Sequence, residues 1–159
     1  MMRKIIAILT AVLGISLAAG MIFGAEFLEK QTLENGTEFE FEVLSCYVYE
    51  ADDARTVDLT FDMDLDALGT DYCCPEQKEN GLCRWITCKK NADNAVDLNL
   101  LWKRTAVEMN DSVQAEYEQY CKENKKRAEY TWDEVDSGIA TVKIYNGNVI
   151  VTDVKFGIK

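Results

Sequence analysis

The chain has 159 residues, with 17 Lys and Arg against 28 Asp and Glu, six Cys, one Pro and no His, for a formal net charge of −11. Clustered cations hold the phosphates of nucleic acids, so this acidic balance excludes nucleic acid as an expected partner. The absence of His removes the most frequent general base and catalytic metal ligand. The composition therefore predicts no catalytic residues and no cofactor, and it indicates that the protein is not an enzyme.

The amino terminus carries a predicted export segment. Arg3 and Lys4 precede residues 5–25, which contain no charged side chain. Such a run is long enough to cross a hydrocarbon core of roughly 30 Å. Because positive charge stays on the cytoplasmic side, the rest of the chain is expected outside the cytoplasm, anchored in the cytoplasmic membrane by a single N-terminal helix.

A cleavable signal peptide is the alternative to this anchor. Ala18 and Gly20 place small side chains at the spacing that suits cleavage near Gly20, before Met21. Residues 1–25 are therefore interpreted as a membrane anchor or a signal peptide, and both interpretations stay open. Residues 26–159 are predicted to form a single extracytoplasmic domain with 15 basic and 28 acidic groups.

Alternating side chains mark the first strands. In residues 37–43, Phe39, Phe41 and Val43 fall on one face and Glu side chains on the other, which is typical of a half-buried strand. A second strand is predicted over 56–65 after a connecting loop. Its apolar face consists of Val57, Leu59, Phe61, Met63 and Leu65.

The sequence between the second strand and the carboxyl terminus predicts three further elements. Residues 96–102 alternate and are predicted as a strand. The apolar side chains of the next segment recur at helical spacing, with a capping box expected at Asp111. They are Met109, Val113, Tyr117, Tyr120 and Cys121.

Residues 140–154 predict a hairpin with a type I′ turn at Asn146-Gly147. This order predicts an α+β fold, with a mainly antiparallel sheet, one amphipathic helix and a disulfide-stapled loop after an N-terminal hydrophobic helix.

All six cysteines follow the hydrophobic segment. They are Cys46, Cys73, Cys74, Cys83, Cys88 and Cys121. An even number of Cys outside the cytoplasm favours disulfides, although six thiols allow 15 full pairings. The polar segment 73–88 is predicted to be a loop held by such bridges. Free or redox-active thiols and a four-thiolate zinc site are alternatives, but zinc ligands usually come as regularly spaced close pairs, and these gaps are irregular.

Alternating carboxylates at Asp62, Asp64 and Asp66 invite a calcium interpretation, because calcium takes several carboxylate oxygens at that spacing. An EF-hand loop would need Gly where Ala67 stands and Glu where Cys73 stands. The pattern is therefore interpreted as the exposed acidic face of a strand, and no metal site is predicted.

The order of features resembles the GDYxxLxY family of membrane-anchored bacterial envelope proteins. The segments that carry the resemblance are 32–41, 115–120 and the hairpin turn at 146–147, behind an apolar amino terminus. It covers nearly the whole exported part except the cysteine-rich segment. The family motif falls on residues 54–61, where Leu59 matches and Phe61 is a near match, whereas Ala54 and its two neighbours differ. The resemblance implies an envelope domain without catalytic residues, often linked to other membrane proteins.

These observations predict a non-catalytic extracytoplasmic domain that binds or supports another membrane or surface protein. The membrane is a further expected partner, through residues 5–25 if they are not cleaved. The alternative is a freely secreted, disulfide-stabilised binding protein that acts as a toxin, inhibitor or ligand.

Overall fold

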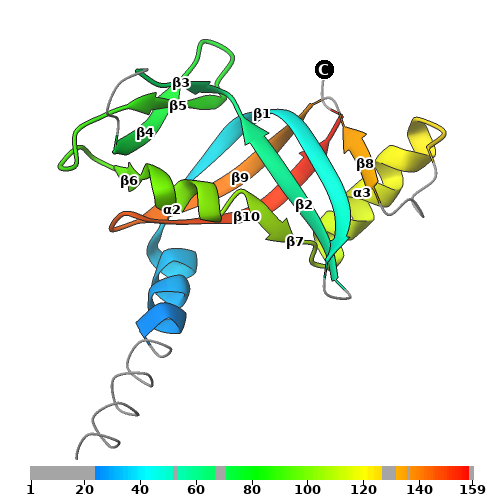
Figure 1. Cartoon of the computed structure of the whole chain (residues 1–159), viewed down its shortest axis with the longest axis horizontal. Coiled ribbons are helices and arrows are strands. Elements are labelled where there is room, and N and C mark those ends of the chain that lie inside the picture. The colour runs from blue at the N-terminus through cyan, green and yellow to red at the C-terminus, as the bar shows by residue number, and fades with distance from the viewer. Residues whose placement is uncertain (1–23, 52–53, 67–70, 127–131, 136, 158–159) are drawn as a thin grey trace, which may run out of the picture.

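The computed structural model describes residues 24–51, 54–66, 71–126, 132–135 and 137–157. Strands dominate this part of the chain, in a mixed but mostly antiparallel sheet with helices beside it (Figure 1). The predicted α+β class is confirmed. Most of the predicted anchor, residues 1–23, lies outside the described residues. No helix within the described part is long and apolar enough to cross a membrane.

The strand β1 (Thr37–Ala51) is the centre of the fold. Its first half pairs antiparallel with β9 (Gly138–Tyr145), and its second half lies between β2 (Ala54–Phe61) and β8 (Trp132–Val135). The strand β10 (Asn148–Phe156) extends the sheet beyond β9, and β7 (Ala106–Glu108) extends it beyond β2. We call these six strands the main sheet.

A bulge in β1 changes which side chains face the core. Phe41 and Val43 are buried as predicted, but the register with β2 shifts between Val43 and Ser45. Leu44 is left 50% exposed, and burial resumes at Cys46 and Val48. A bulge inserts one unpaired residue and so exchanges the two faces of a strand. The strand predicted over 37–43 therefore continues eight residues further, to Ala51.

The predicted cysteine-rich loop is a β-hairpin. The strands β4 (Tyr72–Gln77) and β5 (Cys83–Thr87) pair antiparallel, and the short β3 (Met63–Asp64) and β6 (Val96–Asp97) flank them. We call residues 72–97 the hairpin lobe. Its hydrophobic anchor is Trp85, which is fully buried and stacks on Phe41 with ring centroids 4.3 Å apart. Packing of Trp85 against the main sheet therefore orders this segment, which we had expected disulfides to hold.

The strand predicted over 96–102 is largely wrong. Only Val96–Asp97 is strand, and the helix α2 (Leu98–Lys103) follows at once. The Asp97 carboxylate accepts hydrogen bonds from the backbone N–H groups of Asn99 and Leu100, so it caps this helix. The Asp97 carboxylate thus accepts hydrogen bonds from backbone N–H groups of the first helical turn. In a strand, a neighbouring strand would have accepted them.

The predicted amphipathic helix is confirmed as α3 (Asp111–Glu123), with Val113, Tyr117 and Cys121 buried. Its cap is one residue earlier than expected, because the Asn110 side chain accepts a hydrogen bond from the Val113 N–H. The helix packs on β10 through Tyr117 and Phe156, whose ring centroids lie 5.5 Å apart.

The carboxyl-terminal hairpin is confirmed in register. Val142 pairs with Val151 and Ile144 pairs with Val149. Asn146 and Gly147 have φ values of 49° and 79°, as a type I′ turn requires.

Residues 24–35 form a helix that leaves the domain beside this turn (Figure 1). Thr32 is fully buried at the end of the helix and accepts a hydrogen bond from Asn148, at 2.8 Å. Lys143 donates to the Leu33 carbonyl at 2.8 Å. The carboxyl end of the helix is thereby fixed to the hairpin β9–β10.

Candidate functional site

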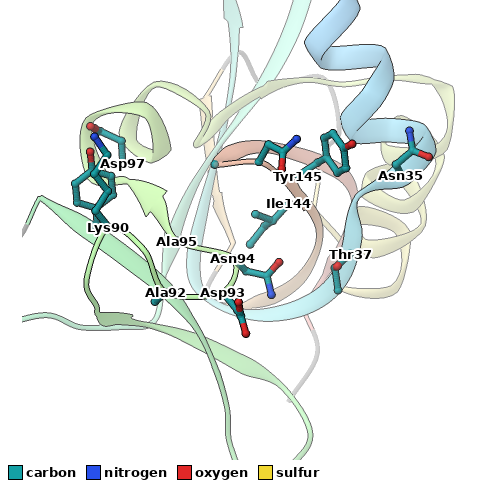
Figure 2. Close-up of a pocket in the computed structure, with 13 residues that line it drawn as sticks. Asn35, Thr37, Lys90, Ala92, Asp93, Asn94, Ala95, Asp97, Ile144 and Tyr145 are labelled. Carbon is teal, nitrogen blue, oxygen red and sulfur yellow. The ribbon is translucent and has the colours of Figure 1, made fainter.

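A polar cleft of about 600 Å³ lies where the helix 24–35, the β9–β10 turn and the loop after β5 converge. The helix end contributes Asn35, the hairpin contributes Tyr145, and the loop 89–95 forms the facing wall. Figure 2 shows Lys90 and Asp97 on one side and Asn35 and Tyr145 on the other, with Asn94 between them. Segments far apart in the sequence thus combine at one opening.

Left-handed backbone positions shape two walls of the cleft. Asn94 has a φ of 57° and Asn146 a φ of 49°. Asparagine tolerates this conformation better than most residues, because its short side chain can hydrogen-bond to the backbone nearby. Turns of this kind bring their polar side chains to the rim of the cleft, where a ligand can reach them.

The electrostatics of the cleft are mixed. Lys90 places its ammonium 5.8 Å from the centroid of the Tyr72 ring, in a cation–π contact. Asp97 faces the same opening while its carboxylate caps α2. Carboxylate, ammonium, amide and phenol groups therefore line one space, and they suit a ligand that presents both donors and acceptors, such as a polypeptide backbone.

The sequence did not single out the residues of the cleft. The loop 89–95 has a composition rich in Asn, Asp and Ala that is typical of turns, and Asn146-Gly147 was predicted as a turn. That composition could have marked both segments as exposed and polar. Only tertiary packing brings these two turns beside Tyr72 and Asn35, and no local sequence pattern indicates that they are neighbours.

The predicted cysteines fall into two groups. Cys73, Cys74 and Cys88 gather at one end of the hairpin lobe, where Cys74 and Cys88 are diagonal neighbours across the pair β4–β5. The other three are buried in separate elements, namely Cys46 in β1, Cys83 in β5 and Cys121 in α3. The structure holds all six as thiols, so the disulfide framework stays a prediction.

Burial raises the pKa of several of these thiols. The pKa of Cys46 rises from 9.0 to about 12 through desolvation, and that of Cys73 also rises to about 12, through desolvation and then the nearby Cys88 and Cys74. The pKa of Cys88 rises to about 11, first by desolvation and then by its hydrogen bond with Cys74. Low-pKa thiols react most readily, so these groups are poor nucleophiles at neutral pH.

The positions matched to the family motif belong to the core. Leu59 and Phe61 are 2% and 3% exposed in β2, facing the same side as Val57. They contribute packing, and neither lines the cleft.

The alternating carboxylates lie beside cations of the hairpin lobe. The Asp62 Oδ2 atom accepts a hydrogen bond from Lys78 at 2.9 Å, and Asp64 Oδ2 lies 3.2 Å from an Arg84 nitrogen. Lys78 also donates to Glu42, and this pair of acceptors raises the pKa of its ammonium. No group of three or more His, Cys, Asp and Glu that could hold a metal ion occurs among the described residues.

Comparison with models of protein families, with curated proteins and with solved structures gives no match. The resemblance to the GDYxxLxY family therefore stays a prediction that rests on the order of its sequence features.

Proposed function

We propose that this protein is a non-catalytic, membrane-tethered extracytoplasmic domain that binds or supports another membrane or surface protein. The observation that carries the proposal is the fixed junction between the helix 24–35 and the domain, at the rim of the polar cleft. Because the uncharged segment 5–25 runs directly into this helix, the cleft would open on the side of the domain that faces the tether.

The geometry of the junction favours a partner close to the membrane. A helix of residues 24–35 measures about 18 Å at 1.5 Å per residue. Thr32 anchors its end to Asn148, so the domain cannot swing freely about Gly36. A ligand in the cleft would then lie within about 20 Å of residue 24, within reach of the exposed part of a neighbouring membrane protein.

Apolar side chains on the helix support the same arrangement. Phe27 and Leu28 are 61% and 49% exposed, and Leu33 is 43% exposed. At about 100° per residue these side chains point to different sides of the helix, so each side of this projecting element offers an apolar group to a membrane surface or a protein.

Fractionation of cells that produce the full chain tests the tether. We expect the intact chain in the membrane fraction, and its intact mass should include residues 1–25. A product that begins at Met21 and appears in the medium would contradict the tether and would favour the secreted binding protein instead.

Site-specific photocrosslinking in intact cells tests the partner. A photoreactive residue in place of Asp93, which is exposed on the wall of the cleft, should give a discrete adduct with a membrane or surface protein. The same residue in place of Gln119, which is exposed on α3, is the matched control. Equal adducts from both positions, or none from position 93, would contradict binding at the cleft.

A further inference from the structure

The pairing of β4 with β5 sorts the lobe cysteines onto opposite faces of the hairpin. Cys73 pairs with Thr87 and Cys74 pairs with Ile86, and the Cys88 N–H donates to the Tyr72 carbonyl at 3.0 Å. Because side chains alternate along a strand, Cys74 and Cys88 share one face as diagonal neighbours. Cys73 points to the other face.

Burial separates the same residues. Cys74 and Cys88 are half-buried, so a redox partner can reach them. Cys73 is fully buried, and its thiol lies 3.8 Å from the Val96 carbonyl as a weak donor. Cys74 and Cys88 are therefore the neighbouring pair of cysteines in the lobe that solvent can reach.

We propose that Cys74 and Cys88 form a disulfide in the exported protein, and that this bridge fixes the loop 89–95 that walls the cleft. Cys88 is the residue immediately before that loop and lies one position beyond the end of β5. Diagonal neighbours start roughly 7–8 Å apart, just beyond the Cα separation that a disulfide spans, so the bridge requires a backbone shift, which the position of Cys88 at the strand end permits.

The oxidation needs a disulfide as oxidant, which a thiol–disulfide oxidoreductase supplies outside the cytoplasm and oxidised glutathione supplies in vitro. The Cys74 thiolate attacks that disulfide and forms a mixed disulfide, and Cys88 then loses its proton and displaces the oxidoreductase as its sulfur bonds to Cys74. The two thiols lose two protons and two electrons in total, and the oxidoreductase leaves as a dithiol. This inference rests on the proposed extracytoplasmic location only for the supply of oxidant.

Peptide mapping of the purified full chain tests the bridge directly. The protein is equilibrated in an oxidised glutathione buffer, alkylated, and digested with trypsin. Cleavage after Arg55, Lys78, Arg84 and Lys89 places Cys73 and Cys74 on the peptide 56–78, Cys83 on 79–84, and Cys88 alone on 85–89. We expect a covalent pair of 56–78 with 85–89, and complete loss of alkylation at Cys88 relative to the reduced protein.

Matched variants assign the sulfur within the peptide 56–78. Cys74→Ser should abolish the crosslinked pair, whereas Cys73→Ala should retain it. Fragmentation of the native crosslinked peptide between Cys73 and Cys74 gives the same assignment without a variant, which covers the case that Cys73→Ala does not fold. A bridge assigned to Cys73, or an alkylated Cys88 in oxidising buffer, would overturn the inference, and either result would leave the fractionation test of the tether unaffected.

Discussion

The main sheet and the hairpin lobe obtain their order in different ways. In the main sheet, β9 buries an alternating apolar face along its whole length, from Gly138 to Ile144. The lobe buries a small apolar group around Trp85 and adds ion pairs at its edge. A short, polar hairpin can thus be ordered by one large side chain inserted into the core of its neighbour.

The strongest test of this comparison removes that side chain. Trp85→Ala should lower the free energy of unfolding by about 3–5 kcal/mol, because it deletes a fully buried indole and leaves a cavity beside Phe41. Urea unfolding followed by far-UV circular dichroism measures the loss.

The matched control is Trp102→Ala, since Trp102 is 53% exposed on α2. Its substitution should change the free energy of unfolding by less than about 0.5 kcal/mol. Equal losses from the two substitutions would mean that Trp85 does not anchor the lobe. Trp85→Phe should recover much of the stability, because it keeps a stacked ring and removes an indole N–H that has no acceptor among the described residues.

A second test concerns the protonation of buried thiols in protein kept reduced. The pKa of Cys46 in the main sheet is raised by burial from 9.0 to about 12. The unfolded thiol loses its proton near pH 9 while the folded thiol keeps it, so this stabilisation is fully present below pH 9. It is lost as pH rises from about 9 toward 12, at about 1.4 kcal/mol per pH unit.

The measurement is the free energy of unfolding at several pH values between 9 and 11, for the reduced wild-type chain and for Cys46→Ala. We expect a shallower decline in the variant by about 1.4 kcal/mol per pH unit. Identical slopes would indicate that the Cys46 thiol ionises in the folded state as readily as in the unfolded chain. Cys73 gives the corresponding slope for the hairpin lobe, since burial raises its pKa to about 12 as well.

The smallest expected effect concerns the ion pairs at the boundary between the two regions. Lys78 of the lobe donates to Glu42 of β1 and to Asp62, and its side chain is 30% exposed. Partly exposed ion pairs contribute little and are screened by salt. Lys78→Gln should therefore speed hydrogen exchange modestly in β4 and β5 at low salt, and less so at high salt.

The control for this substitution is Lys122→Gln, because Lys122 is exposed on α3. It should leave exchange in β4 and β5 unchanged. If Lys78→Gln also left exchange in the lobe unchanged at low salt, packing of Trp85 alone would hold the lobe to the main sheet.

Local patterns predicted the parts of the fold whose structure depends on residues close together in the sequence. The alternation of Phe39, Phe41 and Val43 predicted the start of β1, and the helical spacing from Val113 to Cys121 predicted α3. Asn146-Gly147 predicted the turn and the register of β9 with β10. Residues 98–102 were misassigned to a strand because their apolar side chains also suit a short helix, which the Asp97 cap then selects.

For the candidate site, the sequence predicted the polar turns but not that they lie beside each other. Residues 89–95 and 146–147 are recognisable as turns from their composition, whereas Asn35 and Tyr72 carry no pattern that would join them to those turns. The sequence identified the six cysteines but not which of them are neighbours. The strand register separates them into groups and brings Cys74 beside Cys88.

By itself, the sequence determined the charge balance, the apolar amino-terminal segment, the alternating strands and the amphipathic helix, because periodicity and composition act over a few residues. Only the tertiary structure decided the bulge at Leu44, the place of Trp85, the cysteine neighbours and the polar cleft. Each of these depends on which strands lie side by side. Strand pairing is a long-range choice that minimises exposed apolar surface and unpaired backbone groups across the whole domain.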